Sequence, residues 1–167
     1  MFKSIEEFLQ TWKSHSSDTQ KYMNNLTDSS LNQESATGER TLPRAAWHIV
    51  TTIPEMAGRT GLKLSGPSQE SPIPKSAKEI ASGYRQLSES LMEQVKLHWK
   101  DDTLQTEDDM YGFKWKRGLT LRILIDHEIH HRGQMSVLMR QAGLKVPGIF
   151  GPSLEEWSQH GAKPPEI

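Results

Sequence analysis

The sequence contains no cysteine among its 167 residues. A protein thiol therefore cannot serve as nucleophile, metal ligand or disulfide partner, and any thiol chemistry must come from a substrate. The sequence also has no apolar run of about 18 residues, the length that a transmembrane helix needs. Residues 1–7 do not resemble a signal peptide. These absences predict a cytoplasmic protein with no membrane partner.

A charge excess of either sign is missing as well. Lysine and arginine number 20 and aspartate and glutamate 21, so the net charge is -1 and no basic surface is expected to bind nucleic acid. Apolar residues make up only 34% of the chain, which leaves room for a bound metal or a subunit interface to contribute to stability. A chain of this length is expected to form one domain.

Apolar side chains recur at three- and four-residue spacing in four segments, which predicts four long helices. The segments are residues 4–24, 42–59, 76–100 and 120–141. Capping boxes, in which a serine is followed three residues later by glutamate, are expected at Ser4 and Ser76. Thr41 is the expected N-cap of the second helix, and Gly143 the expected left-handed C-cap of the fourth.

The segments outside these helices are polar or rich in proline and glycine. They predict a loop with one helical turn (27–40), a long crossover loop (61–75), a connection with a short extended turn near Tyr111 (101–117), a short capped helix (153–157) and a mobile tail (158–167). Together the elements predict an all-α fold, a four-helix bundle with long crossover loops, in a single domain of residues 1–157.

The fourth helical segment contains the run His127-Glu128-Ile129-His130-His131. His127 and His131 are four residues apart, so on a helix their imidazoles lie on one face and can reach one metal ion. They share a stripe with Leu124 and Leu138, which predicts that both imidazoles face inward. Inward imidazoles need polar partners, and a shared divalent metal would provide one.

A third ligand is expected from a facing helix, because metal sites in bundles draw on several helices. Three histidines in the other segments have inward registers, namely His15, His48 and His98. Periodicity alone does not choose between them. His130 lies about 100° round the helix from the neighbouring histidine, so it is expected to be exposed or to contact a ligand.

The same run also spells His-Glu-x-x-His, the motif of zinc proteases in which Glu128 would be the general base. This interpretation is disfavoured because Gln134 stands where the longer protease motif has glycine, and Val137 where it has histidine. No sheet is predicted that could align a peptide substrate. Glu128 is by default expected to be solvated or to contact a ligand histidine.

Three residues that follow the histidines have more ordinary expected roles. Arg132 is expected to pair with Asp126 or Glu128 rather than with a substrate. Gly133 is unfavourable inside a helix, and close packing of a neighbouring helix is the expected reason. Gln134 continues the inward stripe, so it is expected to hydrogen-bond a ligand histidine or a substrate.

Several of these motifs together resemble the DinB family of metalloenzymes (the DinB/YfiT-like superfamily). The residues that carry the resemblance are Ala45-Ala46-Trp47-His48-Ile49, His127 to His131 with Arg132-Gly133-Gln134, Met139-Arg140-Gln141-Ala142-Gly143, and the run from Val146 to Pro152. The resemblance covers essentially the whole chain and is strongest in the fourth helix and the segment after it.

The resemblance implies a four-helix bundle in which three histidines hold a divalent metal, usually zinc or nickel. It implies that the third ligand is His48, and because family members are often homodimers, a homodimer is expected. Characterised relatives include S-transferases that use bacillithiol or mycothiol and a thiol-dependent isomerase. The function expected on this basis is a metal-dependent transferase acting with a low-molecular-weight thiol.

Two other functions use the same predicted site. A metal-dependent hydrolase would activate water there, with Glu128 or another carboxylate moving the proton. A non-enzymatic stress protein would use the metal only to stabilise a polar bundle. A requirement for added thiol distinguishes the transferase from the hydrolase, and removal of the metal tests the structural role.

Overall fold

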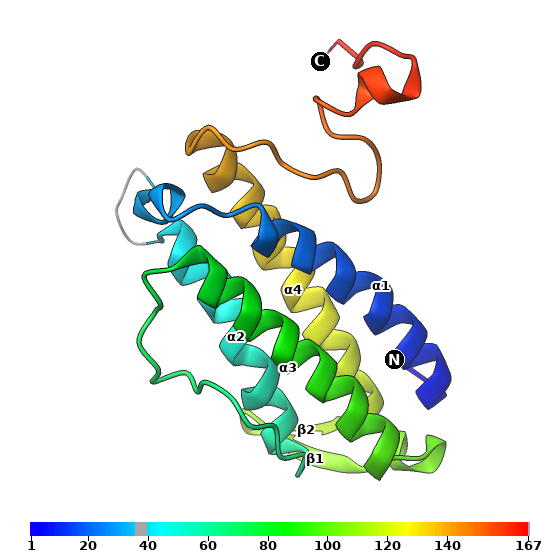
Figure 1. Ribbon diagram of the computed structural model, residues 1–167. Coiled ribbons are helices and arrows are strands. Elements are labelled where there is room, and N and C mark those ends of the chain that lie inside the picture. The colour runs from blue at the N-terminus through cyan, green and yellow to red at the C-terminus, as the bar shows by residue number, and fades with distance from the viewer. Residues whose placement is uncertain (36–39, 167) are drawn as a thin grey trace.

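The structure is a computed structural model that describes residues 1–35 and 40–166 (Figure 1). Its four long helices are α1 (Ile5–Asn24), α2 (Leu42–Arg59), α3 (Ala77–His98) and α4 (Arg117–Gln141). The smaller elements are a hairpin of β1 (Glu107–Met110) and β2 (Phe113–Lys116) and the 3-10 helices η1 (Ser29–Asn32), η2 (Asp101–Gln105) and η3 (Trp157–His160). The predicted four-helix, all-α fold is confirmed.

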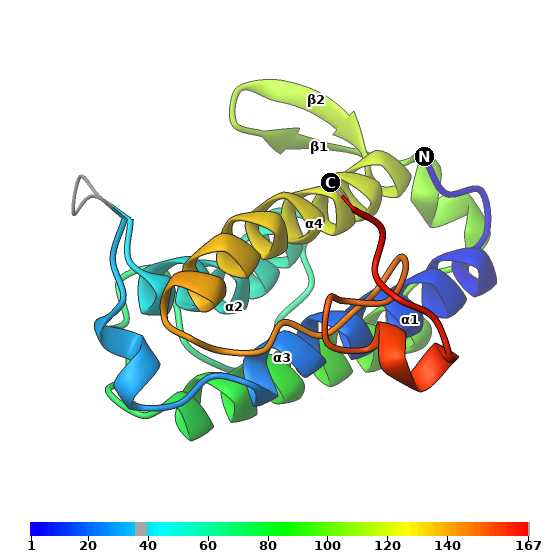
Figure 2. The same cartoon turned by 90° about the horizontal axis from the view of Figure 1, so that it is seen from above.

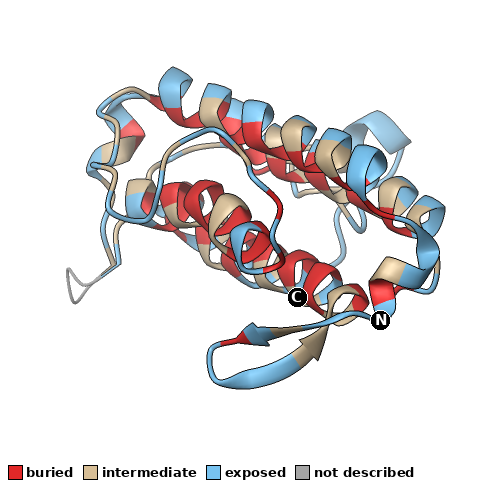
Figure 3. Ribbon diagram, turned by 90° about the horizontal axis from the view of Figure 1, so that it is seen from below, coloured by how far each residue is buried: buried red, intermediate tan, exposed pale blue. Residues whose placement is uncertain are grey.

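The helices pack in the order α1, α3, α2, α4 around the bundle, and each contacts two neighbours. One continuous core fills the interior, and Figure 3 shows the buried residues along the inward faces of the helices. The indole nitrogen of Trp12 on α1 donates to the carbonyl of Ser88 on α3 at 3.0 Å, a buried polar contact between these two helices. Because α4 lies between α1 and α2, it buries two of its faces.

The helix starts follow local capping chemistry in two of three predicted cases. The hydroxyl of Ser4 accepts from the Glu7 amide at 3.1 Å, and the Thr41 hydroxyl caps α2. The predicted box at Ser76 is wrong, because the Ser76 side chain makes no capping bond. The carboxylate of Asp28, far away in the sequence, instead accepts from the Ala77 amide at 2.8 Å.

The predicted left-handed cap of α4 at Gly143 is confirmed, with a φ of 75°. The Gly143 amide donates to the Arg140 carbonyl at 3.0 Å, and the Leu144 amide donates to the Met139 carbonyl at 2.9 Å. These bonds satisfy carbonyls that would otherwise lack partners at the helix end. The chain then turns back, and Figure 2 shows it crossing over toward α1.

The antiparallel hairpin between α3 and α4 was expected only as a short extended turn. Tyr111 and Gly112 connect the strands with positive φ angles of 61° and 87°, the geometry of a tight two-residue turn. The Tyr111 hydroxyl donates to Glu55 on α2 at 2.6 Å and so ties the hairpin to the bundle.

The segment after α4 differs from its prediction. The short helix expected over residues 153–157 is wrong, because the Glu156 carboxylate accepts from the backbone amides of Gly148 and Ser153 and closes a turn there. A 3-10 helix begins only at Trp157.

Within the described residues, no helix is both long and apolar enough to cross a membrane.

Two glycines of α4 are expected to respond oppositely to alanine. A Cβ at Gly118 would lie 2.7 Å from the carbonyl oxygen of Phe2, so Gly118→Ala should lower the free energy of unfolding by roughly 2 kcal/mol. A Cβ at Gly133 would meet nothing within 4 Å, so the predicted packing role is wrong. Gly133→Ala should therefore raise that free energy by about 1 kcal/mol.

Urea unfolding of both variants beside the unaltered protein, all with a chelator present, measures these two changes. A loss of stability in Gly133→Ala would show that something other than helix propensity governs this position.

Candidate metal centre

Three imidazoles from two helices converge at one point of the bundle. His48 comes from α2, and His127 and His131 come from successive turns of α4. The Nε2 atom of His127 lies 3.1 Å from Nε2 of His48 and 3.0 Å from Nε2 of His131. Among the described residues these three form the group of donors close enough to share a metal ion.

The spacing of the three nitrogens fits a divalent ion. Zinc–nitrogen bonds of about 2.0–2.1 Å at tetrahedral angles place neighbouring nitrogens about 3.3 Å apart. The observed separations of 3.0 and 3.1 Å are close to this value. Imidazole nitrogens are ligands that zinc and nickel accept. The three residues could therefore hold one metal ion together, and they are the three that the resemblance to the DinB family implied.

The three imidazoles are held in the neutral form that metal binding needs. Burial, and after it the neighbouring histidines, lower the pKa of His127 to about 4. Burial also lowers the pKa of His131. The pKa of His48 is lowered first by burial and then by the positive charges of Arg40 and Arg44.

Gln134, one turn after His131, sets which nitrogen of that imidazole carries the proton. Its amide oxygen lies 2.8 Å from Nδ1 of His131. An amide oxygen only accepts, so the proton is on Nδ1 and the lone pair of Nε2 points toward the other histidines. The same oxygen accepts from Arg40 at 3.0 Å, and the Gln134 nitrogen lies 3.0 Å from Nε2 of the exposed His130.

The two other candidate ligands lie elsewhere. His98, predicted to face inward, is exposed because it is the last residue of α3 and the helix ends before the next turn. His15 is half-buried on α1, and its ring centroid lies 6.2 Å from that of Phe150 in the C-terminal segment. Neither residue belongs to the group of converging donors.

Glu128 is not solvated, contrary to its default expectation, since only 1% of it is exposed. Its Oε2 atom accepts from the hydroxyls of Tyr84 on α3 and Thr19 on α1, at 2.9 and 3.0 Å. Burial raises the pKa of Glu128 to about 7, although these hydrogen bonds and the positive charge of Arg132 act in the opposite direction. The carboxyl group faces the α1–α3 side of α4.

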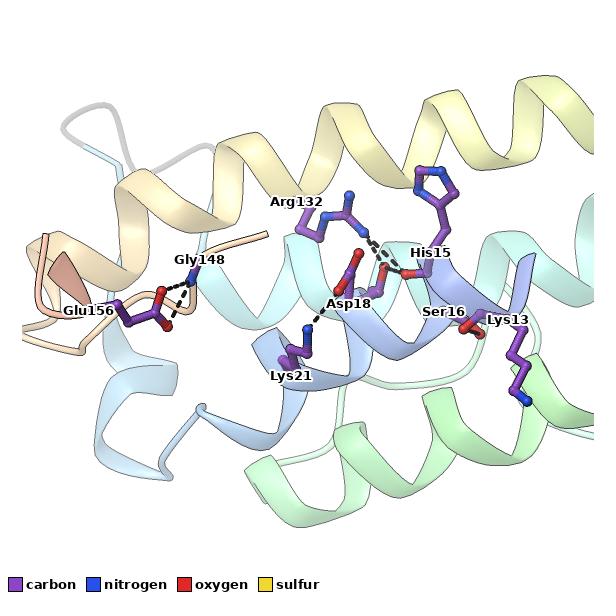
Figure 4. A network of polar contacts seen from close by, with 9 residues as sticks. Lys13, His15, Ser16, Asp18, Lys21, Arg132, Gly148 and Glu156 are labelled. Carbon is purple, nitrogen blue, oxygen red and sulfur yellow. Dashed lines mark hydrogen bonds and ion pairs between the residues drawn. The ribbon is translucent and has the colours of Figure 1, made fainter. Parts of the chain in front are cut away.

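Arg132 belongs to the same buried network rather than pairing with Asp126 or Glu128 directly. It reaches from α4 to α1, where it donates to the Thr19 hydroxyl at 2.9 Å and to the His15 carbonyl at 3.2 Å (Figure 4). Asp126 pairs with Arg122 instead. Consecutive residues of α4 thus lie on different faces of the helix. The histidines face α2, and the residues of the buried network face α1.

A cavity of about 470 Å³ opens onto the three-histidine cluster. It is lined by Arg40, Arg44, Ala45, His48, His131 and Gln134. Sequence reasoning missed the two arginines. Arg44 stands four residues before His48, a spacing that places both side chains on one face of α2 and could have revealed it. Glu128 does not line the cavity.

The raised pKa of Glu128 predicts a pH dependence of stability in the metal-free protein. Below the ordinary carboxyl value of 4.5 the group is protonated in both states and has no effect, whereas up to about pH 7 only the unfolded state releases the proton. Stability is therefore lost as the pH rises from 4.5 to 7. Glu128→Gln should remove this loss, a relative gain of about 3 kcal/mol at pH 7.5 and little at pH 4.5.

Urea unfolding of Glu128→Gln and of the unaltered protein at several pH values, with a chelator present, isolates this effect because the other titrating groups cancel. A stability difference that does not change between pH 4.5 and 7.5 would contradict it.

Comparisons with known proteins agree with this fold and these motifs. A family model described as the DinB family matches residues 1–165. An uncharacterized protein of Bacillus subtilis (strain 168), YrdA, is 44% identical over 167 residues, which cover 100% of both chains.

Two solved structures are similar as well. A DinB-like protein from Bacillus cereus ATCC 10987 is 49% identical, with a TM-score of 0.86 over 89% of this chain and 99% of that one. The DinB-like protein YjoA of Bacillus subtilis, at 17% identity, shares the fold with a TM-score of 0.67 over 86% of this chain and 97% of its own.

Proposed function

This chain belongs to the DinB family, and we propose that it is a divalent-metal-dependent enzyme that transfers a low-molecular-weight thiol to an electrophile. The observation that carries the proposal is the convergence of three neutral imidazoles, those of His48, His127 and His131, beside an open cavity. Zinc and nickel are the metals that we propose for this site. His48, His127 and His131 would hold this ion, which would lower the pKa of a thiol bound beside them.

The residues around the site support a thiol as the group that reacts. No carboxylate lines the cavity within the described part of the chain, and Glu128 is engaged by Tyr84 and Thr19 on the other side of α4. A hydrolase at this site would use a carboxylate to move the proton of its water, whereas a free thiol already ionises near pH 8.5 without one. The absence of cysteine from the chain means that no protein thiol competes.

In the proposed reaction the sulfur of the thiol bonds to the electrophilic carbon, and the leaving group, such as chloride, departs with its electron pair. The thiol proton passes to solvent through the open cavity. Gln134 keeps the proton of His131 on Nδ1, so the lone pair of Nε2 stays available as a metal ligand. The cavity volume of about 470 Å³ suits a small molecule.

The test supplies a panel of small thiols with a chlorinated nitroaromatic or an epoxide and follows adduct formation. Metal-loaded protein is expected to accelerate the reaction, and His131→Ala is expected not to. If the protein hydrolyses an ester or amide without any thiol and forms no thiol adduct, it is a hydrolase and not a transferase. A large fall in the melting temperature on metal removal, with neither activity, would favour a purely structural metal.

We also propose a homodimer. The end of α4 and the segment after it carry apolar side chains that remain exposed, namely Val137 (57%), Phe150 (81%) and Leu154 (64%). Such side chains are candidates for burial in an interface between subunits. Light scattering at micromolar concentration should return a mass twice that of the 19.0 kDa chain, and a mass near 19.0 kDa would contradict the proposal.

A further inference from the structure

The mouth of the three-histidine cavity carries two guanidinium groups. Arg44 lies in the first turn of α2, one turn before His48, and Arg40 lies two residues before the helix begins. Both line the same cavity as His48 and His131. Together with neutral histidines and the neutral amide of Gln134, they make the described lining of this cavity positively charged in a chain whose net charge is -1.

Four of the other six arginines of the described chain pair with a carboxylate, through Glu55, Asp108, Asp126 and Glu155. Arg40 instead donates to the uncharged oxygen of Gln134, and no described carboxylate pairs with the guanidinium of Arg44. A guanidinium in a cavity without a carboxylate is a ready partner for an anion, since its planar fork matches the oxygens of a carboxylate or another oxyacid.

The position of Arg44 relative to His48 gives the anion a place in the site. Residues four apart on a helix are neighbours, so the guanidinium of Arg44 lies over the same face of α2 as the imidazole. Both arginines line one cavity together with His48 and His131. A molecule bound by the arginines therefore extends toward the histidines.

We propose that the substrate of this cavity carries an anionic oxygen group, a carboxylate or a tetrahedral oxyacid, which Arg44 and Arg40 bind while its reacting atom reaches the three histidines. The inference rests on the proposed function for the identity of the reacting atom, a thiol sulfur. The contact with the anion depends only on the arginines. The expected substrates are thus small anionic thiols rather than neutral ones.

The test measures binding of three matched thiols to the metal-loaded protein by titration calorimetry at low salt. Mercaptopropionate carries a carboxylate, mercaptoethanesulfonate a tetrahedral oxyacid, and mercaptopropanol no charge. At least one anionic thiol should bind roughly fivefold more tightly than mercaptopropanol, an advantage that shrinks as the ionic strength rises. Which of the two binds better identifies the geometry of the anionic group.

Arg44→Gln should remove most of that advantage and leave the affinity for mercaptopropanol unchanged. Arg85→Gln on α3 is the matched control, since Arg85 is exposed, lies outside this cavity and forms no ion pair with a described residue. It should bind all three thiols like the unaltered protein. Arg40→Gln should weaken the binding of the anionic thiols too, but it also removes a hydrogen bond to Gln134. The Arg44→Gln protein is therefore the variant that tests the inference.

Equal affinities for anionic and neutral thiols, or an Arg44→Gln protein that still prefers the anionic ones, would overturn the inference. Failure of the proposed function gives a different result. If no thiol adduct forms but propionate or ethanesulfonate binds and is lost in Arg44→Gln, the anion site stands without the transferase. If adducts form equally fast from all three thiols in both proteins, the transferase stands and the anion site falls.

Discussion

His131→Ala is expected to bind less than about one tenth of the divalent metal that the unaltered protein binds under the same conditions. The imidazole of His131 supplies one of three converging nitrogens and lies in the wall of the cavity. Its loss leaves His48 and His127, too few ligands to hold zinc or nickel tightly. Elemental analysis of protein purified from medium with added metal, followed by dialysis, measures the effect. His48→Ala and His127→Ala should behave alike.

His15→Ala and His98→Ala are the matched controls, because both remove an imidazole that lies outside the cluster. Their metal content should equal that of the unaltered protein. Gln134→Ala should fall between the two groups, with an affinity for the metal roughly 10- to 100-fold weaker. The substitution removes the acceptor that holds the proton of His131 on Nδ1. A filled site in His48→Ala and an empty one in His98→Ala would refute the ligand set.

Arg132→Ala should lower the free energy of unfolding by roughly 3 kcal/mol or more. Only 4% of Arg132 is exposed, and its guanidinium holds the Thr19 hydroxyl and the His15 carbonyl, which join α4 to α1. Truncation leaves both groups without this donor and opens a cavity beside the buried Glu128. Urea unfolding with a chelator present separates this loss from any change in metal binding.

Arg122→Ala on the same helix provides the comparison. Arg122 forms an exposed pair with Asp126, four residues on, and pairs of this kind contribute about 0.3–0.5 kcal/mol. A loss in Arg132→Ala as small as the loss in Arg122→Ala would show that the buried network contributes little to stability.

The sequence predicted the parts of the fold that short-range chemistry determines. The caps at Ser4, Thr41 and Gly143 depend on residues within one turn, and the long periodic segments define the four helices. The cap at Ser76 failed because the bond that starts α3 comes from Asp28, which only the folded chain brings near. The hairpin was missed because strands of four residues are too short for an alternating pattern.

The candidate site shows the same division. Four-residue spacing paired His127 with His131, whereas periodicity left His15, His48 and His98 equivalent, because it gives the face of a helix and not its neighbour. The apolar stripe that contains His127 and His131 marks only one buried face of α4, so it did not predict that Glu128 is buried. The helix packs against both α1 and α2 and so has two buried faces.

This double burial of α4 constrains how the helix can change. His127 is followed directly by Glu128, so one turn of helix carries a group facing α2 and a group facing α1; His131 and Arg132 repeat the arrangement one turn later. Any rotation of α4 about its axis that improved the histidine cluster would pull the buried network out of register, and the reverse is also true. A rotation of α4 is therefore expected to change metal affinity and resistance to unfolding together. A substitution that leaves the helix in its present orientation can change one of them alone.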